Sequence, residues 1–216
     1  MTDGVLVAAC RVHQLIPDSG NGTTAIDKRP ATGAVRVSRF GLFGDVQADR
    51  RHHGGEDQAV YAYAEEDALH FSRELERAVP PGLFGENLRT RGIAVTDAVI
   101  GERWRVGTQV LLEVTYPRTP CGTFERRMGL PDWQDRFRRH GASGAYLRVL
   151  KAGSIRAGDT VAVVERPAHG VTIGRWFQRQ DPDDARALLA AHADGAVVLR
   201  EKLRDHIDRA VRRAGV

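Results

Sequence analysis

Short apolar runs separated by glycine-rich turns fill the first 165 residues, and this pattern constrains the fold most. The runs are rich in β-branched and aromatic residues, and some alternate apolar and polar positions as a half-buried strand does. They cover residues 5–12, 34–37, 59–63, 104–106, 109–114, 145–150 and 160–164. Many short strands with frequent turns favour a closed or nearly closed β-barrel over a parallel α/β sheet.

Helices interrupt the strands in two places. Residues 65–79 have apolar positions near helical spacing and stop at two prolines, which predicts a helix. Residues 123–140 predict two short basic helices with a break at 129–131. The polar segment 17–33 is too long for a simple turn, so we expect a functional loop there.

The character of the chain changes to helix after Pro167. Asp181 predicts an N-cap and Pro182 the first helical position, with acidic residues in the first turn. Helices are expected over 185–193 and 197–213. The sequence therefore predicts a barrel domain at 1–166 and a helical appendage at 167–216, packed on the barrel or on a second subunit.

Composition excludes several classes of protein. The 32 basic and 28 acidic residues give a net charge of +4, which is not the surface of a dedicated nucleic-acid binder. No run approaches the roughly 18 apolar residues of a membrane span, and residues 1–10 lack the basic region of a secretory signal. Two cysteines fit a reducing cytoplasm, so we expect a cytoplasmic protein that binds neither membrane nor nucleic acid.

One of those cysteines, Cys121, stands in a stiff and electropositive segment. Pro117 and Pro120 fix the backbone around it, and Arg118 lies three residues upstream. A nearby cation favours the thiolate, which is both the nucleophile and the metal-binding form of cysteine. The local sequence is equally compatible with a buried hydrophobic cysteine, since free cysteines are often buried.

Three other segments have the composition of ligand-binding loops. Residues 44–55 combine glycine with arginine and histidine, which suits a phosphate or another anion. Asn87, just ahead of an expected strand, suits the polar edge of a heterocycle, and Lys28 lies in the long polar loop. Taken alone, residues 44–55 are better explained as a surface turn with solvated charges, and Asn87 could belong to an ordinary turn stabilised by its own side chain.

The order of these segments along the chain identifies a family more specifically than any single segment does. The series is IDKRP at 26–30, GLFGD at 41–45 followed by Asp49, HGG at 53–55, AVYAY at 59–63, FGENL at 84–88, IGE at 100–102 and PRTPC at 117–121. Over roughly residues 4–165 the chain resembles the MOSC domain, the molybdenum cofactor sulfurase C-terminal domain. It is most similar to the stand-alone bacterial YiiM-type branch.

The resemblance implies a mainly β fold, a barrel similar to that of pyruvate kinase, with a small C-terminal helical segment. It implies binding of the molybdenum cofactor (molybdopterin) and reduction of N-hydroxylated small molecules of the hydroxylaminopurine or amidoxime type. Cys121 matches the cysteine that ligates molybdenum, and is the expected catalytic and metal-binding residue. The matching cofactor-binding positions are Lys28, Arg51, His53, Asn87 and Arg118. The family-level association with pyridoxal phosphate also comes with the resemblance.

Electrons would come from a separate donor protein, because the sequence has neither an iron–sulfur cysteine set nor a dinucleotide fingerprint. A monomer or a homodimer is expected. The chain departs from the family at 122–124, after the cysteine, and only two C-terminal helices are legible where three are usual. The residues also leave open a sulfur carrier with a persulfide on Cys121, or a protein that binds another phosphorylated ligand and uses Cys121 structurally.

Overall fold

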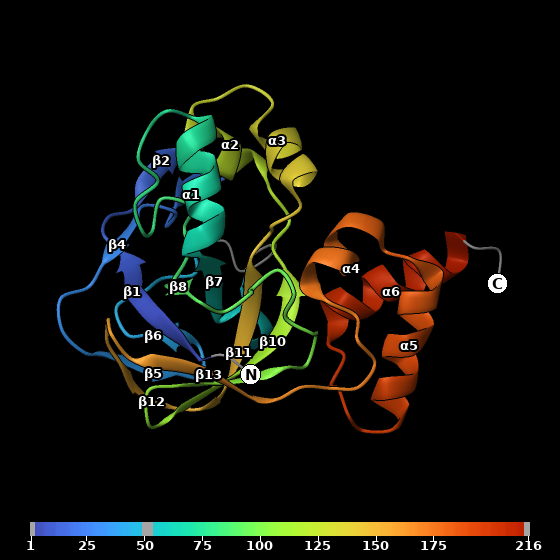
Figure 1. The fold of residues 1–216 in the computed structure, drawn as a ribbon. Coiled ribbons are helices and arrows are strands. Elements are labelled where there is room, and N and C mark those ends of the chain that lie inside the picture. Colours follow the sequence, from blue (N-terminus) through green and yellow to red (C-terminus); the bar gives the residue numbers. More distant parts are fainter. Residues whose placement is uncertain (1–2, 49–53, 214–216) are drawn as a thin grey trace.

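The computed structural model describes residues 3–48 and 54–213. Within them, seven strands close a barrel in the order β13-β9-β10-β11-β7-β8-β1, and β1 pairs back onto β13 (Figure 1). The barrel strands are β1 (Gly4–Val12), β7 (Val60–Ala64), β8 (Leu88–Arg91), β9 (Arg103–Val106), β10 (Val110–Pro117), β11 (Ala145–Lys151) and β13 (Thr160–Glu165). The predicted barrel is confirmed, and each barrel strand except β8 overlaps a predicted run.

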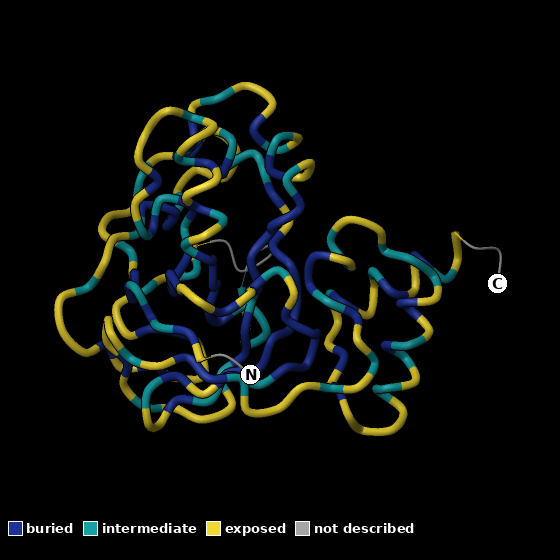
Figure 2. Tube along the Cα trace, in the orientation of Figure 1, coloured by how far each residue is buried: buried dark blue, intermediate teal, exposed yellow. Residues whose placement is uncertain are grey.

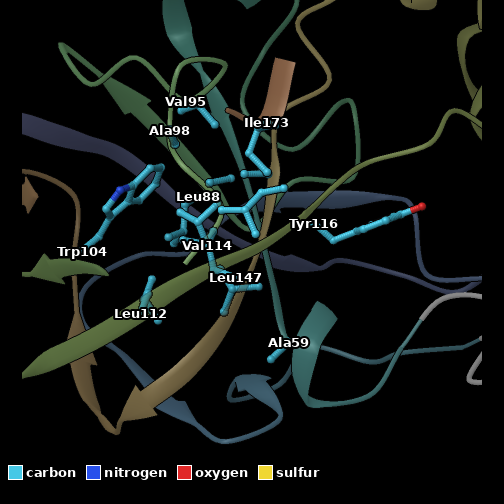
Figure 3. Close-up of a cluster of buried hydrophobic side chains, with 14 of the residues drawn as sticks. Ala59, Leu88, Val95, Ala98, Trp104, Leu112, Val114, Tyr116, Leu147 and Ile173 are labelled. Atoms are coloured by element: carbon cyan, nitrogen blue, oxygen red, sulfur yellow. The ribbon is translucent and has the colours of Figure 1, made fainter. Parts of the chain in front are cut away.

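Apolar side chains fill the barrel. Figure 3 shows Leu88, Trp104, Leu112 and Leu147 directed toward a common interior, and all four are buried. Figure 2 shows the same distribution along the chain: the barrel strands are largely buried and the outer loops exposed. Burial of this apolar surface is the main force that holds the strands together.

Strand β7 is buried along its whole length because both of its faces are covered. Its alternating side chains divide between two clusters: Val60, Ala62 and Ala64 enter the barrel core, whereas Tyr61 and Tyr63 point to an outer aromatic cluster. β7 runs parallel to β8, and every other barrel pair is antiparallel.

The outer aromatic cluster joins three helices that lie together at one end of the barrel (Figure 1). These helices are α1 (Glu65–Glu74), α2 (Gly122–Met128) and α3 (Trp133–His140). Phe71 of α1 lies 5.0 Å from Trp133 of α3 between ring centroids, and Phe84 lies 5.2 Å from Phe124 of α2. The two predicted basic helices are thereby confirmed as α2 and α3.

Helix α1 ends earlier than predicted, at Glu74 instead of Val79. The carbonyls of Val79 and Pro80 accept hydrogen bonds from the guanidinium of Arg89, at 3.2 and 3.3 Å, and do not continue the helix. A tertiary contact, invisible in the local sequence, therefore sets the course of the segment after α1.

The predicted loop 17–33 contains short strands. β2 (Ile16–Asp18) and β3 (Gly22–Thr24) form a hairpin, and β4 (Lys28–Pro30) pairs with the end of β1. A separate three-stranded sheet consists of β5 (Val35–Ser38), β6 (Gly41–Leu42) and β12 (Gly153–Ile155). η1 (Glu56–Gln58) is a short 3-10 helix ahead of β7. Pairing with β1 fixes Lys28 against the barrel.

Three helices follow the barrel and lie beside β10 (Figure 1). They are α4 (Ile173–Arg179), α5 (Pro182–Ala193) and α6 (Glu201–Arg213). The cap at Asp181 is confirmed, since its side chain accepts from the backbone N–H of Asp183 at 2.8 Å. The prediction of two helices was wrong because it missed α4. Helix α6 starts at Glu201 and not at 197. The segment before it is not helical, because it places Val197 and Leu199 in the core.

The C-terminal helices share one continuous core with the barrel, which includes Ile173, Trp176 and Ile207. The domain boundary after residue 166 stays a prediction. No helix among the described residues has the length and apolar character needed to cross a membrane.

We expect Ile207→Ala to lower the free energy of unfolding by about 2–5 kcal/mol, because it leaves a cavity under α6. Denaturant unfolding, followed by tryptophan fluorescence and circular dichroism, measures the loss. If helices and barrel are one cooperative unit, both signals shift together. A shift of only part of the helical signal would instead show that residues 167–216 unfold independently.

Candidate functional site

A pocket opens at the end of the barrel where β10 ends and β8 and β11 begin. Four of the predicted site residues line it together: Lys28, Asn87, Arg118 and Cys121. They come from β4, from the segment before β8 and from the connection between β10 and α2. The other two predicted residues, Arg51 and His53, lie outside the described residues.

Cys121 lies immediately before α2, in an extended backbone conformation with φ −132° and ψ 169°. Its carbonyl accepts the backbone N–H of Glu125 at 3.0 Å, the first turn of that helix. The side chain is half-buried on the pocket wall, whereas the other cysteine, Cys10, is fully buried. Burial raises the pKa of the Cys10 thiol to about 12, so Cys10 is a protonated core residue.

Arg118 is a buried cation: only 6% of its surface is exposed. Its Cζ lies 3.9 Å from the ring centroid of Phe124 and 5.0 Å from that of Tyr61. Nη1 donates to the carbonyl of Phe84 at 2.6 Å. Among the described residues, no carboxylate forms an ion pair with Arg118. Two aromatic faces and a carbonyl stabilise its charge, and an anion in the pocket would complete its pairing.

Asp45 organises the opposite wall. Its Oδ2 lies 2.6 Å from Nζ of Lys28 and 2.7 Å from Nδ2 of Asn87, and its Oδ1 accepts the N–H of Val12 at 2.9 Å. Asp45 belongs to the GLFGD motif at 41–45, from which no role for its side chain was predicted. The available signal was an acidic residue directly after Gly44, at a turn where such side chains often bind backbone.

The amide of Asn87 is occupied by the protein itself. Its Oδ1 accepts the N–H of Tyr61 at 3.1 Å, and its Nδ2 donates to the carbonyl of Cys10 at 3.2 Å as well as to Asp45. Asn87 thus ties β1, β7 and the Asp45 loop together beneath the pocket. These bonds position the pocket wall, and the direct ligand contact expected of Asn87 stays a prediction.

Two tyrosines, Tyr61 and Tyr146, complete the pocket wall beside Arg118. Burial raises the pKa of both phenols, so both are protonated at neutral pH. The Tyr61 hydroxyl donates to the carbonyl of Ser143 at 2.9 Å. The part of the chain that the structure describes has no group of three or more His, Cys, Asp or Glu that could hold a metal ion.

The sequence profile of the MOSC domain matches residues 49–162, which include strands β7 to β11 and Cys121. This chain belongs to the MOSC domain family. The protein YiiM of Escherichia coli (strain K12) is 31% identical over 177 residues, which are 78% of each chain. A protein of Gibberella moniliformis named "Reductase" is 37% identical over 155 residues, which are 68% of this chain and 27% of that protein.

The fold comparison agrees with this assignment. The crystal structure of YiiM from Geobacillus stearothermophilus superposes with a TM-score of 0.76 and 26% identity, and covers 96% of this chain and 99% of that one. The chain is therefore a MOSC protein of the YiiM type. Because the match extends through the C-terminal helices, they belong to the shared architecture.

A buried ion pair fixes one of the loops that line this MOSC pocket. Glu86 and Arg89 are both fully buried and form a salt bridge, and Glu65 of α1 pairs with Arg89 at 2.9 Å. The Glu86 carboxylate also accepts the backbone N–H groups of Gly82 and Phe84, at 2.8 and 3.1 Å. It thereby fixes the loop whose Phe84 carbonyl binds Arg118.

Gly82 brings the same loop against Lys28. Its φ is +89°, and a Cβ at this position would lie 2.3 Å from the backbone oxygen of Lys28. Only glycine fits this combination of left-handed backbone and close approach. The loop 82–87 and strand β4 therefore meet at the pocket because position 82 has no side chain.

Proposed function

We propose that this protein binds the molybdenum cofactor and reduces N-hydroxylated compounds with electrons from a separate donor protein. One observation carries the proposal: a half-buried thiol, Cys121, shares a pocket with the buried guanidinium of Arg118, with which no carboxylate of residues 3–48 and 54–213 forms an ion pair. The membership in the MOSC family and the printed name of the fungal relative, a reductase, support it.

The pocket residues fit such a cofactor. A phosphorylated pyranopterin needs cationic donors, and Arg118 and Lys28 are two cations that line the pocket. Molybdenum bound through sulfur accepts a soft thiolate as a further ligand, and Cys121 supplies that sulfur. We infer that these three residues hold the group, while Asn87 and Asp45 keep the wall in place. When bound, the cofactor would supply the two-electron chemistry that cleaves an N–O bond.

The chain's own residues would bind and orient the substrate beside Cys121. Reduction of a hydroxylamine to an amine and water consumes two electrons and two protons. The phenol of Tyr146 lines the pocket and stays protonated, so it can donate a hydrogen bond to an N-hydroxyl oxygen. The flanking aromatic rings exclude water and strengthen the electrostatic interactions of Arg118.

Metal content and activity test the proposal together. Protein purified from a host that makes the cofactor should contain about one molybdenum per chain and should reduce N-hydroxylaminopurine with an artificial electron donor. Protein from a host unable to make the cofactor is the control, and should be folded but inactive. Folded protein from the competent host that lacks molybdenum and activity would overturn the proposal.

A further inference from the structure

A second cavity adjoins the candidate pocket. Tyr146 and Gln58 line both spaces, so they form the partition between them. Tyr116, at the end of β10, and Thr119, two residues before Cys121, form the inner wall of the second cavity. The cavity is thus next to the segment that presents the thiol.

Helix α6 forms the outer wall with one polar stripe: Lys202, Asp205, His206 and Arg209. Their spacing of three and four residues places these side chains on one face of the helix. A different face carries the buried residues Leu203, Ile207 and Ala210. The polar stripe therefore lines the cavity beside the pocket, with Lys202 and His206 half-buried and Asp205 and Arg209 exposed to solvent.

His206 is held in this wall as a neutral residue. Its Nε2 lies 2.8 Å from the hydroxyl of Tyr116, with the two rings at 80°, and its Nδ1 lies 3.3 Å from Nε2 of Gln180. Burial, reinforced by neighbouring cations such as Arg209, lowers the pKa of His206. The positive charge of the stripe at neutral pH consequently comes from Lys202 and Arg209.

Among the described residues that line the cavity, two cations, Lys202 and Arg209, face one carboxylate, Asp205. Nζ of Lys202 donates to Oε1 of Gln58 at 2.9 Å, which ties the stripe to the partition. Arg209 is exposed, and its one hydrogen bond to the described residues runs from Nε to the backbone carbonyl of Asp205, at 3.2 Å. Its terminal guanidinium nitrogens are therefore available for a charge-assisted bond to an anion.

We infer that this cavity binds the anionic end of the substrate, so that the N-hydroxylated compound carries a phosphate or carboxylate. The reacting ring lies in the Cys121 pocket against Tyr146, and the anion lies at Lys202 and Arg209. An aromatic partition suits a heteroaromatic ring, and a cationic helix face suits its charged substituent. This inference rests on the proposed function, because only that function makes the bound compound a substrate. Binding of the anion itself can be tested without turnover.

Calorimetric titration of the full-length protein with adenosine 5′-monophosphate and with adenosine tests the anion site. We expect the nucleotide to bind about tenfold or more tightly, the size of one charge-assisted hydrogen bond. Arg209→Ala should remove this preference. The control Arg212→Ala, an exposed arginine on the same helix that does not line the cavity, should keep it. Equal affinities for nucleotide and nucleoside, or equal losses in both variants, would overturn the inference.

Arg118→Met separates this cavity from the cation inside the first pocket. The preference for the nucleotide should survive this substitution, and its loss would place the phosphate at Arg118 and overturn the inference. The same probes used as N-hydroxylated substrates give a second readout: Arg209→Ala should raise KM for the nucleotide alone, with kcat unchanged. A preserved nucleotide preference in a protein that reduces neither compound would contradict the proposed function and leave the anion site intact.

Discussion

Replacing Cys121 with serine is expected to lower the reduction of N-hydroxylaminopurine by about 100-fold or more. Loss of a mere supporting contact around a metal typically costs about 10- to 100-fold, and here the ligand itself is lost. A serine hydroxyl is a hard donor and a poor substitute for a soft thiolate on molybdenum. The bound molybdenum should fall in parallel, as measured by elemental analysis of the same preparations.

Cys10→Ala is the matched control for this substitution. Cys10 is buried and contributes its backbone carbonyl, not its thiol, to the hydrogen bond from Asn87. This variant should therefore keep its molybdenum and most of its activity. Full activity in Cys121→Ser would refute the ligand role. A wild-type protein without molybdenum but with a persulfide on Cys121, detected by mass spectrometry, would point to the sulfur-carrier alternative.

Glu86→Ala is expected to cause the largest loss of stability, about 3–5 kcal/mol, because it leaves the buried Arg89 without its main partner. Arg89 is fully buried, so water cannot replace the lost carboxylate. The backbone N–H groups of Gly82 and Phe84 lose their acceptor in the same substitution. Urea unfolding at neutral pH measures the difference from the wild type.

Glu65→Gln is the comparison that tests whether burial of the carboxylate determines the loss of stability. Glu65 pairs with the same Arg89, but 21% of its side chain is exposed, so its loss should cost less than that of Glu86. Glu86→Gln keeps the shape of the side chain and should give an intermediate loss. If Glu65→Gln and Glu86→Ala destabilised the protein equally, burial of the pair would not be the reason for the effect.

The strands were predictable because their signal is local. The alternation of β-branched and apolar residues reports which face of a strand is buried, and glycine marks the turns. The sequence could not show that Lys28 forms a strand, because β4 is three residues long and exists through its pairing with β1. Helix α4 was missed for a related reason: it is only seven residues long, and its register depends on burial of Ile173 and Trp176 in the shared core.

The candidate site was predictable where the type of a residue indicates the chemistry that it can perform. Cys121 and Arg118 stood out because a thiol, a cation and two prolines occur together. The role of Asp45 was hidden, since its partners Lys28 and Asn87 are 17 and 42 residues away in the chain. The α6 cavity was equally hidden, because the apolar spacing of Leu203 and Ile207 shows which face of the helix is buried but not which barrel residues its polar face meets.

The pairing of Gly4 with Val161 determines when this barrel can close. During synthesis, β1 emerges first but cannot complete the ring until β13 has left the ribosome. Until then β1 and β9 each present an unpaired edge, the kind of surface on which chains associate wrongly. The entropic free-energy cost of joining two segments grows by only about 0.6 kcal/mol for each doubling of the loop between them. The long separation of β1 and β13 therefore delays closure of the barrel more than it lowers the stability of the folded protein.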